Sequence, residues 1–458
     1  MWTWATIYST LVLMFWRLQS MRTKCWGRLT EFKMDIGSIE KTILDRRTKG
    51  IPGCASAFAL DDISKQGWNI LNEDMPLPLM VLNRSNLDYN AELFARYLKA
   101  HDLSLAPHGK TTMSPQIFEQ QLKHGAWGIT AATISQMHVM RAYGIERIIL
   151  ANQLVGKSNI QSVVQELNEY PSFDFFCFID SIDQLQNMSG YLAGMSQLRP
   201  INLLVEIGAS GGRTGMRDKS AALSLIDEIT KMPDQFSFAG IAAFEGAIPK
   251  LEESSKIVEI YCDTVLDIVQ NIPPPIYEGQ KEFILTGGGS AYFDMIVEKF
   301  STLSLSIPVR VVLRSGCYIT NDHGAYSQAQ ELARVNPERH WTQKFRPALE
   351  VWSYVQSIPE PGLAFLTMGK RDMPYDAGLP IPIKRYRPGK GFLEVGMAEI
   401  FNTNDQHAYV RIPHDTDWQV GDMISSGISH PCTAFDKWQF IPIVDENYNV
   451  VDGLLTYF

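Results

Sequence analysis

From about residue 100 onward, short apolar runs alternate with segments in which apolar residues recur every three or four positions. Runs as continuously apolar as these are typical of strands buried on both faces, as in a parallel sheet. The first run is followed by a helix that Ser114 and Pro115 are expected to begin, as N-cap and first-turn residue. In chain order the runs are LSLAPH, AWGITAA, RIILANQL, FDFFCFID, INLLVEIG, FSFAGIAAF, FILTGGG and PVRVVLRSG.

Most of these runs precede a helical pattern, such as SQMHVMRAYG or DKSAALSLIDEITKM. Eight strand–helix units in succession predict a (β/α)8 TIM barrel over residues 84–318. A doubly wound open sheet is the competing architecture, but the number of units favours a closed barrel.

The pattern changes after the barrel region. Helical periodicity fades, prolines accumulate, and short β-rich runs such as LEVGMAEIF and HAYVRIP take over, which predicts a mainly antiparallel β domain over residues 319–458. The earlier run LPLMVLNRS precedes the eight strands and is not needed for the barrel. We therefore expect residues 51–83 to join the β domain.

The N-terminal segment differs from both regions. MWTWATIYSTLVLMFW is apolar but shorter than the stretch of about twenty residues that spans a membrane, and basic residues follow it, whereas a secretory signal has them first. A signal-anchor is one alternative. Because the sequence from Met34 reads like a natural start, we expect residues 1–33 to be an over-extended start, and residues 1–50 to be an extension outside the fold.

Composition narrows the class of partner. The 458 residues are 45% hydrophobic, enough for a large core, and the net charge of −9 contains no long run of like charges. This balance suits small polar substrates and argues against nucleic-acid or membrane partners. The six cysteines lack the spacing of a disulfide framework, which favours the reducing cytoplasm.

In such barrels the working face lies where strands end and helices begin. Polar and glycine-rich residues gather at this end of the predicted strands, which indicates a functional site. They are His108 and Lys110 at the first corner, Asn152 at the third, Glu206 and Arg213 at the fifth, Glu245 at the sixth, TGGGS at the seventh, and Arg314, Cys317 and Tyr318 at the eighth.

The seventh corner has the composition of a phosphate site. Gly287, Gly288 and Gly289 can direct backbone N–H groups at an anion, and Ser290 can cap the next helix and donate to a phosphate oxygen. A plain tight turn is the alternative. Position seven of a barrel favours phosphate, since barrel phosphate sites are frequent there.

A phosphate-bearing aldehyde would give Lys110 a role. A lysine at the barrel mouth can form a Schiff base with pyridoxal phosphate, although an isolated lysine is most often a surface charge. Arg213 can reach the ring of such a cofactor. Its alternative is a salt bridge to Glu206 or Glu245.

The C-terminal region contains a candidate metal pair. His430 and Cys432 are separated by one proline, so in an extended strand both side chains project to the same side. Imidazole and thiolate are good zinc ligands, and a catalytic zinc site keeps positions open for water or substrate. Buried structural residues are the alternative, because two ligands at this spacing are a weak signal.

Two segments together resemble a known family. PHGKTTMSPQIFEQQLKHGAWGITAAT, followed by IILANQLVG, resembles the lysine region of the D-serine dehydratase and D-threonine aldolase group, which are pyridoxal phosphate enzymes of the alanine racemase fold. SHPCTAFDKW is similar to the metal motif of that group, with His and Cys as in the D-serine dehydratases, and it resembles a bacterial branch of amino acid deaminases. The resemblance runs from about residue 45 to the end of the sequence.

The resemblance implies a Schiff-base role for Lys110, zinc at His430 and Cys432, and phosphate at TGGGS. It also implies a D-amino acid substrate and a homodimer. We expect His108, Arg213 and Tyr318 to contact the cofactor. Relatives tend to have a tyrosine at the sixth corner, where this chain has Phe244, so the partner of the pyridine nitrogen stays open.

The expected reaction is dehydration of a D-β-hydroxy amino acid such as D-serine, which gives a keto acid and ammonia. Aldolase cleavage to glycine and an aldehyde, as with D-threonine, uses the same groups and is the first alternative. Racemisation is the second, with Tyr318 as the additional base. A barrel that carries the cofactor without catalysis is the non-enzymatic alternative.

Overall fold

The computed structural model describes residues 34–248, 254–336, 339 and 341–458. The expectation for residues 1–33 lies outside these ranges. Among the helices of the described ranges, none has both the length and the apolar character that a bilayer crossing requires.

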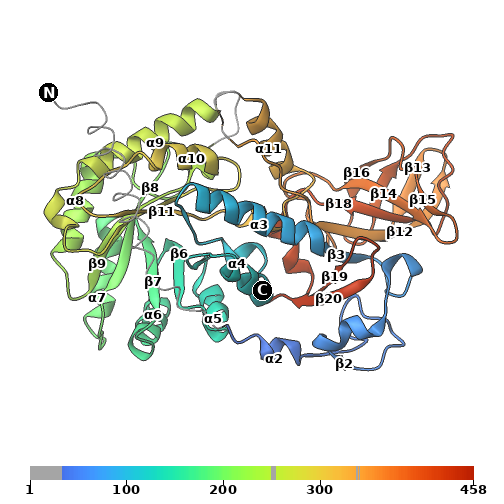
Figure 1. The fold of residues 1–458 in the computed structure, drawn as a ribbon, viewed down its shortest axis with the longest axis horizontal. Coiled ribbons are helices and arrows are strands. Elements are labelled where there is room, and N and C mark those ends of the chain that lie inside the picture. Colours follow the sequence, from blue (N-terminus) through green and yellow to red (C-terminus); the bar gives the residue numbers. More distant parts are fainter. Residues whose placement is uncertain (1–33, 249–253, 337–338, 340) are drawn as a thin grey trace, which may run out of the picture. The chain divides into compact units, whose positions relative to one another are not determined.

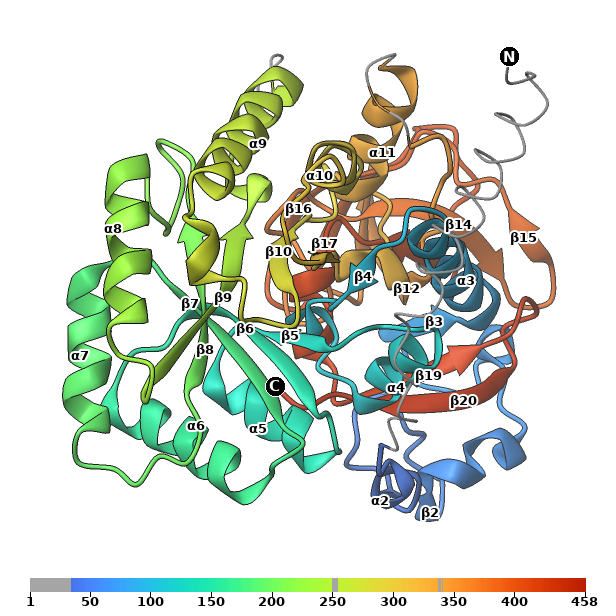
Figure 2. The same cartoon turned by 60° about the vertical axis from the view of Figure 1, so that its left-hand side comes forward.

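The eight predicted strands form one parallel sheet that curls into a nearly closed barrel (Figures 1 and 2). Neighbours follow the order β4-β11-β10-β9-β8-β7-β6-β5, and a parallel bridge between His108 and Thr130 connects the two ends. The strands are β4 (Ser104–Leu105), β5 (Ile129–Ala131), β6 (Arg147–Gln153), β7 (Asp174–Ile179), β8 (Ile201–Ile207), β9 (Phe236–Ala243), β10 (Phe283–Gly287) and β11 (Val309–Leu313).

The barrel interior is a packed core. Side chains from alternating strand positions fill it, as expected for a small barrel. The cluster consists of Ala106, Ile149, Phe176, Phe178, Leu204, Ala239, Ala242, Ile284 and Val312. A substrate must therefore bind at one end of the barrel.

Helices cover the outer face of the barrel, and Figure 2 shows those between β5 and β10 on the side away from the β domain. They are α3 (Arg84–Ala100), α4 (Pro115–Lys123), α5 (Ile134–Ala142), α6 (Lys157–Glu169), α7 (Ile182–Leu192), α8 (Lys219–Thr230), α9 (Ser254–Gln270) and α10 (Phe293–Phe300), with α11 (Ala325–Val335) after the last strand. The amphipathic sequences of α5, α8 and α10 explain their placement, since their apolar faces pack onto the sheet.

The β domain is mainly antiparallel and lies on the right in Figure 1, with the barrel on the left. Its central strand β12 pairs with β18, β13 and the early strand β3, so the run that the barrel did not need belongs to this sheet. The strands are β3 (Leu79–Asn83), β12 (Leu349–Glu360), β13 (Leu363–Leu366), β14 (Ile381–Arg387), β15 (Gly391–Leu393), β16 (Glu399–Thr403), β17 (Ala408–Arg411), β18 (Met423–Gly427), β19 (Phe440–Val444) and β20 (Val450–Leu455).

The expectation that residues 1–50 lie outside the fold is wrong for residues 35–50. They form α2 (Gly37–Glu40) and β1 (Ile43–Leu44), and β1 pairs with β2 (Phe58–Ala59). Ile39 and Leu44 are buried, and the Lys49 ammonium lies 2.7 Å from Asp372 and over the ring of Trp438. These partners lie more than 300 residues further along the chain, so a local pattern could not reveal them.

His323 connects the end of the barrel to the β domain. Its backbone N–H donates to the carbonyl of Ile428 at 2.9 Å. Its ring fills the space beside Gly427, where an added Cβ would lie 2.4 Å from the ring Cγ. Burial lowers the pKa of His323 to about 4. The imidazole is therefore neutral in the folded protein over most of the pH range.

This burial predicts an acid-sensitive contribution to stability. The unfolded chain binds a proton at His323 near pH 6.5 and the folded chain only near pH 4, so stability present above pH 6.5 is lost as the pH falls toward 4. The loss amounts to about 3 kcal/mol at pH 4. In thermal unfolding between pH 4 and 7, His323→Gln is expected to show a shallower pH dependence than the unmodified protein. The exposed His414→Gln should match the unmodified slope, and identical slopes for all three proteins would contradict the assignment.

Candidate active site

Lys110 lies in a short 3-10 turn, η3 (Gly109–Thr111), directly after the first barrel strand. Gly109 allows this turn to pack closely, because an added Cβ would lie 2.5 Å from Met140 and 3.0 Å from Phe118. The Lys110 side chain is half-buried, and no described residue hydrogen-bonds to its amine. The turn therefore fixes the backbone of Lys110 and leaves its amine available.

His108, two residues earlier, has an unfilled hydrogen-bonding position. Its Nδ1 is buried and has no partner among the described residues. Burial, and then the charges of Lys110, Arg314 and Arg213, hold the pKa of His108 well below its usual range. A neutral imidazole with a free nitrogen, next to three cations, fits a polar anionic ligand such as pyridoxal phosphate.

The two arginines of the site differ in their surroundings. Arg314 is buried and donates to Thr286 Oγ1 and to the carbonyl of Ala243, both at 2.7 Å. Arg213 is exposed, with its guanidinium 4.8 Å from the centre of the Phe244 ring. Within the described ranges it forms no salt bridge to Glu206 or Glu245, so the structure does not support that alternative.

The glycine corner is organised differently from the prediction. The N–H groups of Gly288 and Gly289 donate to the carboxylate of Glu245, at 3.2 and 2.5 Å. Glu245 lies in η4 (Glu245–Ala247) and is fully buried, and burial raises its pKa. The N–H groups of these two glycines are therefore already bound to a carboxylate of the protein and are not free to bind a phosphate.

The next helix also starts later than predicted, since α10 begins at Phe293 with Tyr292 as N-cap. Ser290 is not its cap. No acceptor for the N–H groups of Ser290 and Ala291 exists among the residues that the structure describes. We therefore expect a phosphate to bind one or two residues beyond the glycines, at the start of α10.

Tyr318 does not occupy the predicted position. Its ring is buried in an aromatic cluster beneath α3. The centre of the ring lies 4.5 Å from that of Phe94 and 6.0 Å from that of Phe345. Burial raises the pKa of Tyr318 further above its usual value. The side chain fills the core, so it cannot serve as a base or contact a cofactor at the mouth.

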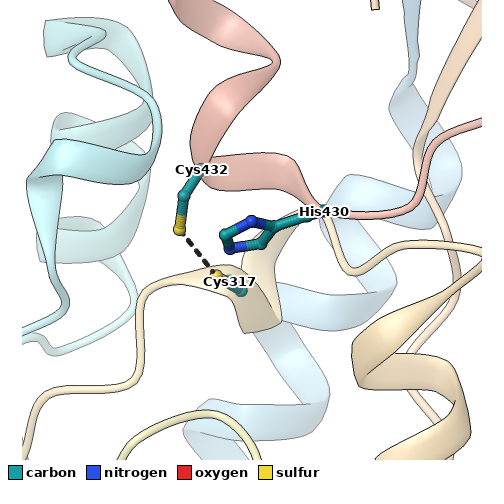
Figure 3. A group of neighbouring side chains, drawn as sticks. All are labelled: Cys317, His430 and Cys432. Carbon is teal, nitrogen blue, oxygen red and sulfur yellow. Dashed lines mark hydrogen bonds between the residues drawn. The ribbon is translucent and has the colours of Figure 1, made fainter. Parts of the chain in front are cut away.

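The structure brings His430 and Cys432 together with a third residue, Cys317 (Figure 3). The potential ligand atoms of these residues all lie within 4.8 Å of one another, and the two sulfur atoms are 3.3 Å apart. His430 is extended, but Cys432 lies in the 3-10 turn η7 (Pro431–Thr433), so a turn and not a strand directs both side chains inward. Cys317 comes from η6 (Cys317–Ile319), directly after the last barrel strand.

A second set of residues orients this cluster. Nδ1 of His430 hydrogen-bonds to Asp376 at 2.7 Å, and Thr433 donates to the other oxygen of that carboxylate at 2.5 Å. Because Asp376 occupies Nδ1, Nε2 is the nitrogen of His430 that would bind a metal, and a carboxylate on the other ring nitrogen is the usual support of a histidine ligand.

The cluster also touches the turn that carries Lys110. The Thr111 hydroxyl lies 3.4 Å from the Cys432 sulfur and 3.9 Å from the Cys317 sulfur. Since Thr111 follows Lys110 directly, the predicted lysine and the predicted metal ligands lie in neighbouring turns, η3 and η7.

The pKa shifts describe a Cys432 thiolate paired with a protonated His430, so a metal that binds here would displace the proton of the imidazole. A hydrogen bond from Cys317, together with the hydrogen bond and charge of His430, holds the pKa of Cys432 well below its usual range. Against the effect of burial, Cys432 and Asp376 raise the pKa of His430 to about 9. Burial raises the pKa of Cys317. Without metal, Cys432 is thus a thiolate, the form that binds zinc.

Sequence analysis does not predict that two further residues, Cys317 and Asp376, contact the His430–Cys432 pair. Cys317 was visible as an eighth-corner residue, but its 115-residue separation from Cys432 concealed their pairing. Asp376 lies in a loop without a recognisable motif, and no local signal could have found it.

Comparison with known proteins supports the assignment of both domains. The profile of the alanine racemase N-terminal domain matches residues 82–278, and that of a putative serine dehydratase domain matches residues 348–444. A D-threonine aldolase of Arthrobacter sp is 25% identical over 383 residues, 82% of this chain and 88% of that protein.

Solved structures share the fold. The crystal structure of D-threonine aldolase from Filomicrobium marinum gives a TM-score of 0.67 at 22% identity, over 84% of this chain and 95% of that one. D-threo-3-hydroxyaspartate dehydratase from Delftia sp. HT23 gives 0.64 at 16% identity, over 85% and 99%. These findings confirm the predicted resemblance and the barrel-plus-β architecture.

The contact between Asp376 and His430 predicts an effect on metal affinity. Asp376→Ala removes the carboxylate that orients the imidazole, and loss of such a partner typically weakens metal binding about 10–100-fold. Competition for zinc with a chromophoric chelator measures this change. Asp405→Ala, at an exposed carboxylate, is the matched control. Equal zinc affinity in the two variants would show that Asp376 does not support a metal ligand.

Proposed function

We propose that this chain, which has the two domains of the D-serine dehydratase and D-threonine aldolase group, is a pyridoxal phosphate- and zinc-dependent lyase. Its substrate would be a D-β-hydroxy amino acid such as D-serine, which it would deaminate to a keto acid and ammonia. One observation carries the proposal. Thr111, next to the proposed cofactor lysine, touches Cys432, a proposed metal ligand, so both could act on one bound molecule.

The residues present fit the cofactor. His108 offers a buried nitrogen without a partner, and the N–H groups of Ser290 and Ala291 are free among the described residues. Lys110 would hold the aldehyde, and Arg213 would lie beside the ring.

When bound, pyridoxal phosphate would withdraw electrons from the substrate α-carbon, and zinc would act as a Lewis acid on the β-hydroxyl. The half-buried Lys110 amine would remove the α-proton. His430 and Cys432 would hold the metal, with Asp376 keeping the imidazole in the correct orientation. The β-hydroxyl would then take up a proton from solvent and leave as water, on the side of the site where Thr111 lies beside Cys432.

Aldolase cleavage is the second candidate, because the Arthrobacter relative is named a D-threonine aldolase. The same residues would serve it if the β-hydroxyl of the substrate lost its proton before the α-carbon did. The serine dehydratase profile over residues 348–444 favours dehydration. Racemisation would need Tyr318 as a second base, but its side chain is packed in the aromatic cluster.

Incubation of the purified protein with D-serine and with D-threonine tests the choice. We expect keto acid and ammonia from D-serine, and loss of this activity after metal removal by a chelator, with recovery when zinc is added back. Glycine and acetaldehyde from D-threonine as the main products would favour the aldolase reaction. Full activity after complete metal removal would contradict a role for zinc.

Lys110→Ala is expected to abolish covalent attachment of the cofactor and to lower the lyase rate by more than about a thousandfold, because the variant lacks both tether and base. Borohydride reduction followed by peptide mapping measures the attachment. Lys157→Ala, at an exposed lysine on α6, should label normally. Cofactor that remains attached in the Lys110 variant would identify a different lysine.

A further inference from the structure

We infer that Cys317 is a third protein ligand of the metal, so that the centre is a Cys2His site with one open position. The inference deepens the proposed function, on which it rests for the presence of a metal at His430 and Cys432. Cys317 follows the last barrel strand, whereas His430 and Cys432 belong to the β domain.

The geometry of the cluster supports this assignment. The Cys317 sulfur lies 3.3 Å from that of Cys432, and the His430 ring points toward the space beside them (Figure 3). Two thiolates on a tetrahedral zinc, each at about 2.3 Å, are about 3.8 Å apart. The observed separation therefore needs an increase of only about half an ångström to admit the ion.

Two hydroxyl groups lie beside the buried sulfur of Cys317. The side chain is 4% exposed, and the hydroxyl of Thr111 lies 3.9 Å from the sulfur. The Tyr326 hydroxyl also hydrogen-bonds to Cys317. Tyr326 is held at the start of α11, where its backbone N–H donates to Asp322 at 3.0 Å. These hydroxyls would support the sulfur as outer partners of a ligand do.

A Cys2His set has a defined chemical consequence. Three protein ligands and one exchangeable position are characteristic of catalytic zinc, and four protein ligands of structural zinc. Two thiolates also select zinc or cobalt over manganese and magnesium, which prefer oxygen ligands. The remaining position would receive the substrate hydroxyl. Cys317 would thus make the centre more selective for soft metals than a histidine–cysteine pair alone.

X-ray absorption of the zinc-loaded, unmodified holoenzyme gives the first test, since it needs no substitution. We expect two sulfur neighbours at about 2.3 Å together with two lighter ones. A single sulfur neighbour would overturn the assignment. So would a Cys317–Cys432 disulfide in the protein purified under reducing conditions, detected by peptide mapping, because it would remove both thiolates.

Cobalt substitution gives a second, independent readout. The sulfur-to-cobalt charge-transfer absorbance of Cys317→Ser is expected to be about half that of the unmodified protein, with zinc affinity lowered at least tenfold. Cys54→Ser, at an exposed thiol, is the control and should match the unmodified protein. An unchanged cobalt spectrum and zinc affinity in Cys317→Ser would overturn the inference.

These measurements distinguish failure of the ligand assignment from failure of the proposed reaction. If the protein binds zinc through two sulfurs but converts neither D-serine nor D-threonine, the ligand assignment stands and the proposed reaction fails. If the lyase reaction is observed and absorption shows one sulfur, the reaction stands and the ligand assignment fails.

Discussion

The contact between two cysteine sulfurs, one from the barrel and one from the β domain, is the constraint on which the site depends. Cys317 follows the last barrel strand, and Cys432 lies in a turn after β18. They meet at 3.3 Å only because the two parts of the chain are docked. The docking is extensive. The amide of Gln116 on α4 donates to Gly453 and accepts from Leu455 on β20, and β3 inserts into the β-domain sheet just before α3 begins the barrel.

Much of this architecture could be predicted from the sequence. The barrel strands are continuous apolar runs, and the corner after each one follows from the strand–helix alternation, so the surroundings of Lys110 could be located without coordinates. His430 and Cys432 could be recognised as a pair because they are separated by one residue. In each case the signal is local.

The remainder depended on contacts between distant segments. The pairing of Cys317 with Cys432, the support of His430 by Asp376 and the burial of residues 35–50 all arise from packing across the chain. The glycine corner shows a different limit. Its sequence is that of an anion site, but a buried carboxylate of the same protein, Glu245, accepts two of its N–H groups. Tyr318 was similarly ambiguous, because a tyrosine that fills a core and one that lines a cavity look alike in sequence.

Docking of the two domains and metal affinity are thermodynamically linked. In the proposed centre the ligands would come from both sides of the interface, so a bound ion would act as a cross-link between the two domains. Any change that loosens the interface must weaken binding of the ion, and by reciprocity loss of the ion must loosen the interface by the same free energy. A substitution of Gln116, whose amide bonds to β20 across the interface, would therefore lower the metal affinity although Gln116 is not one of the proposed ligands.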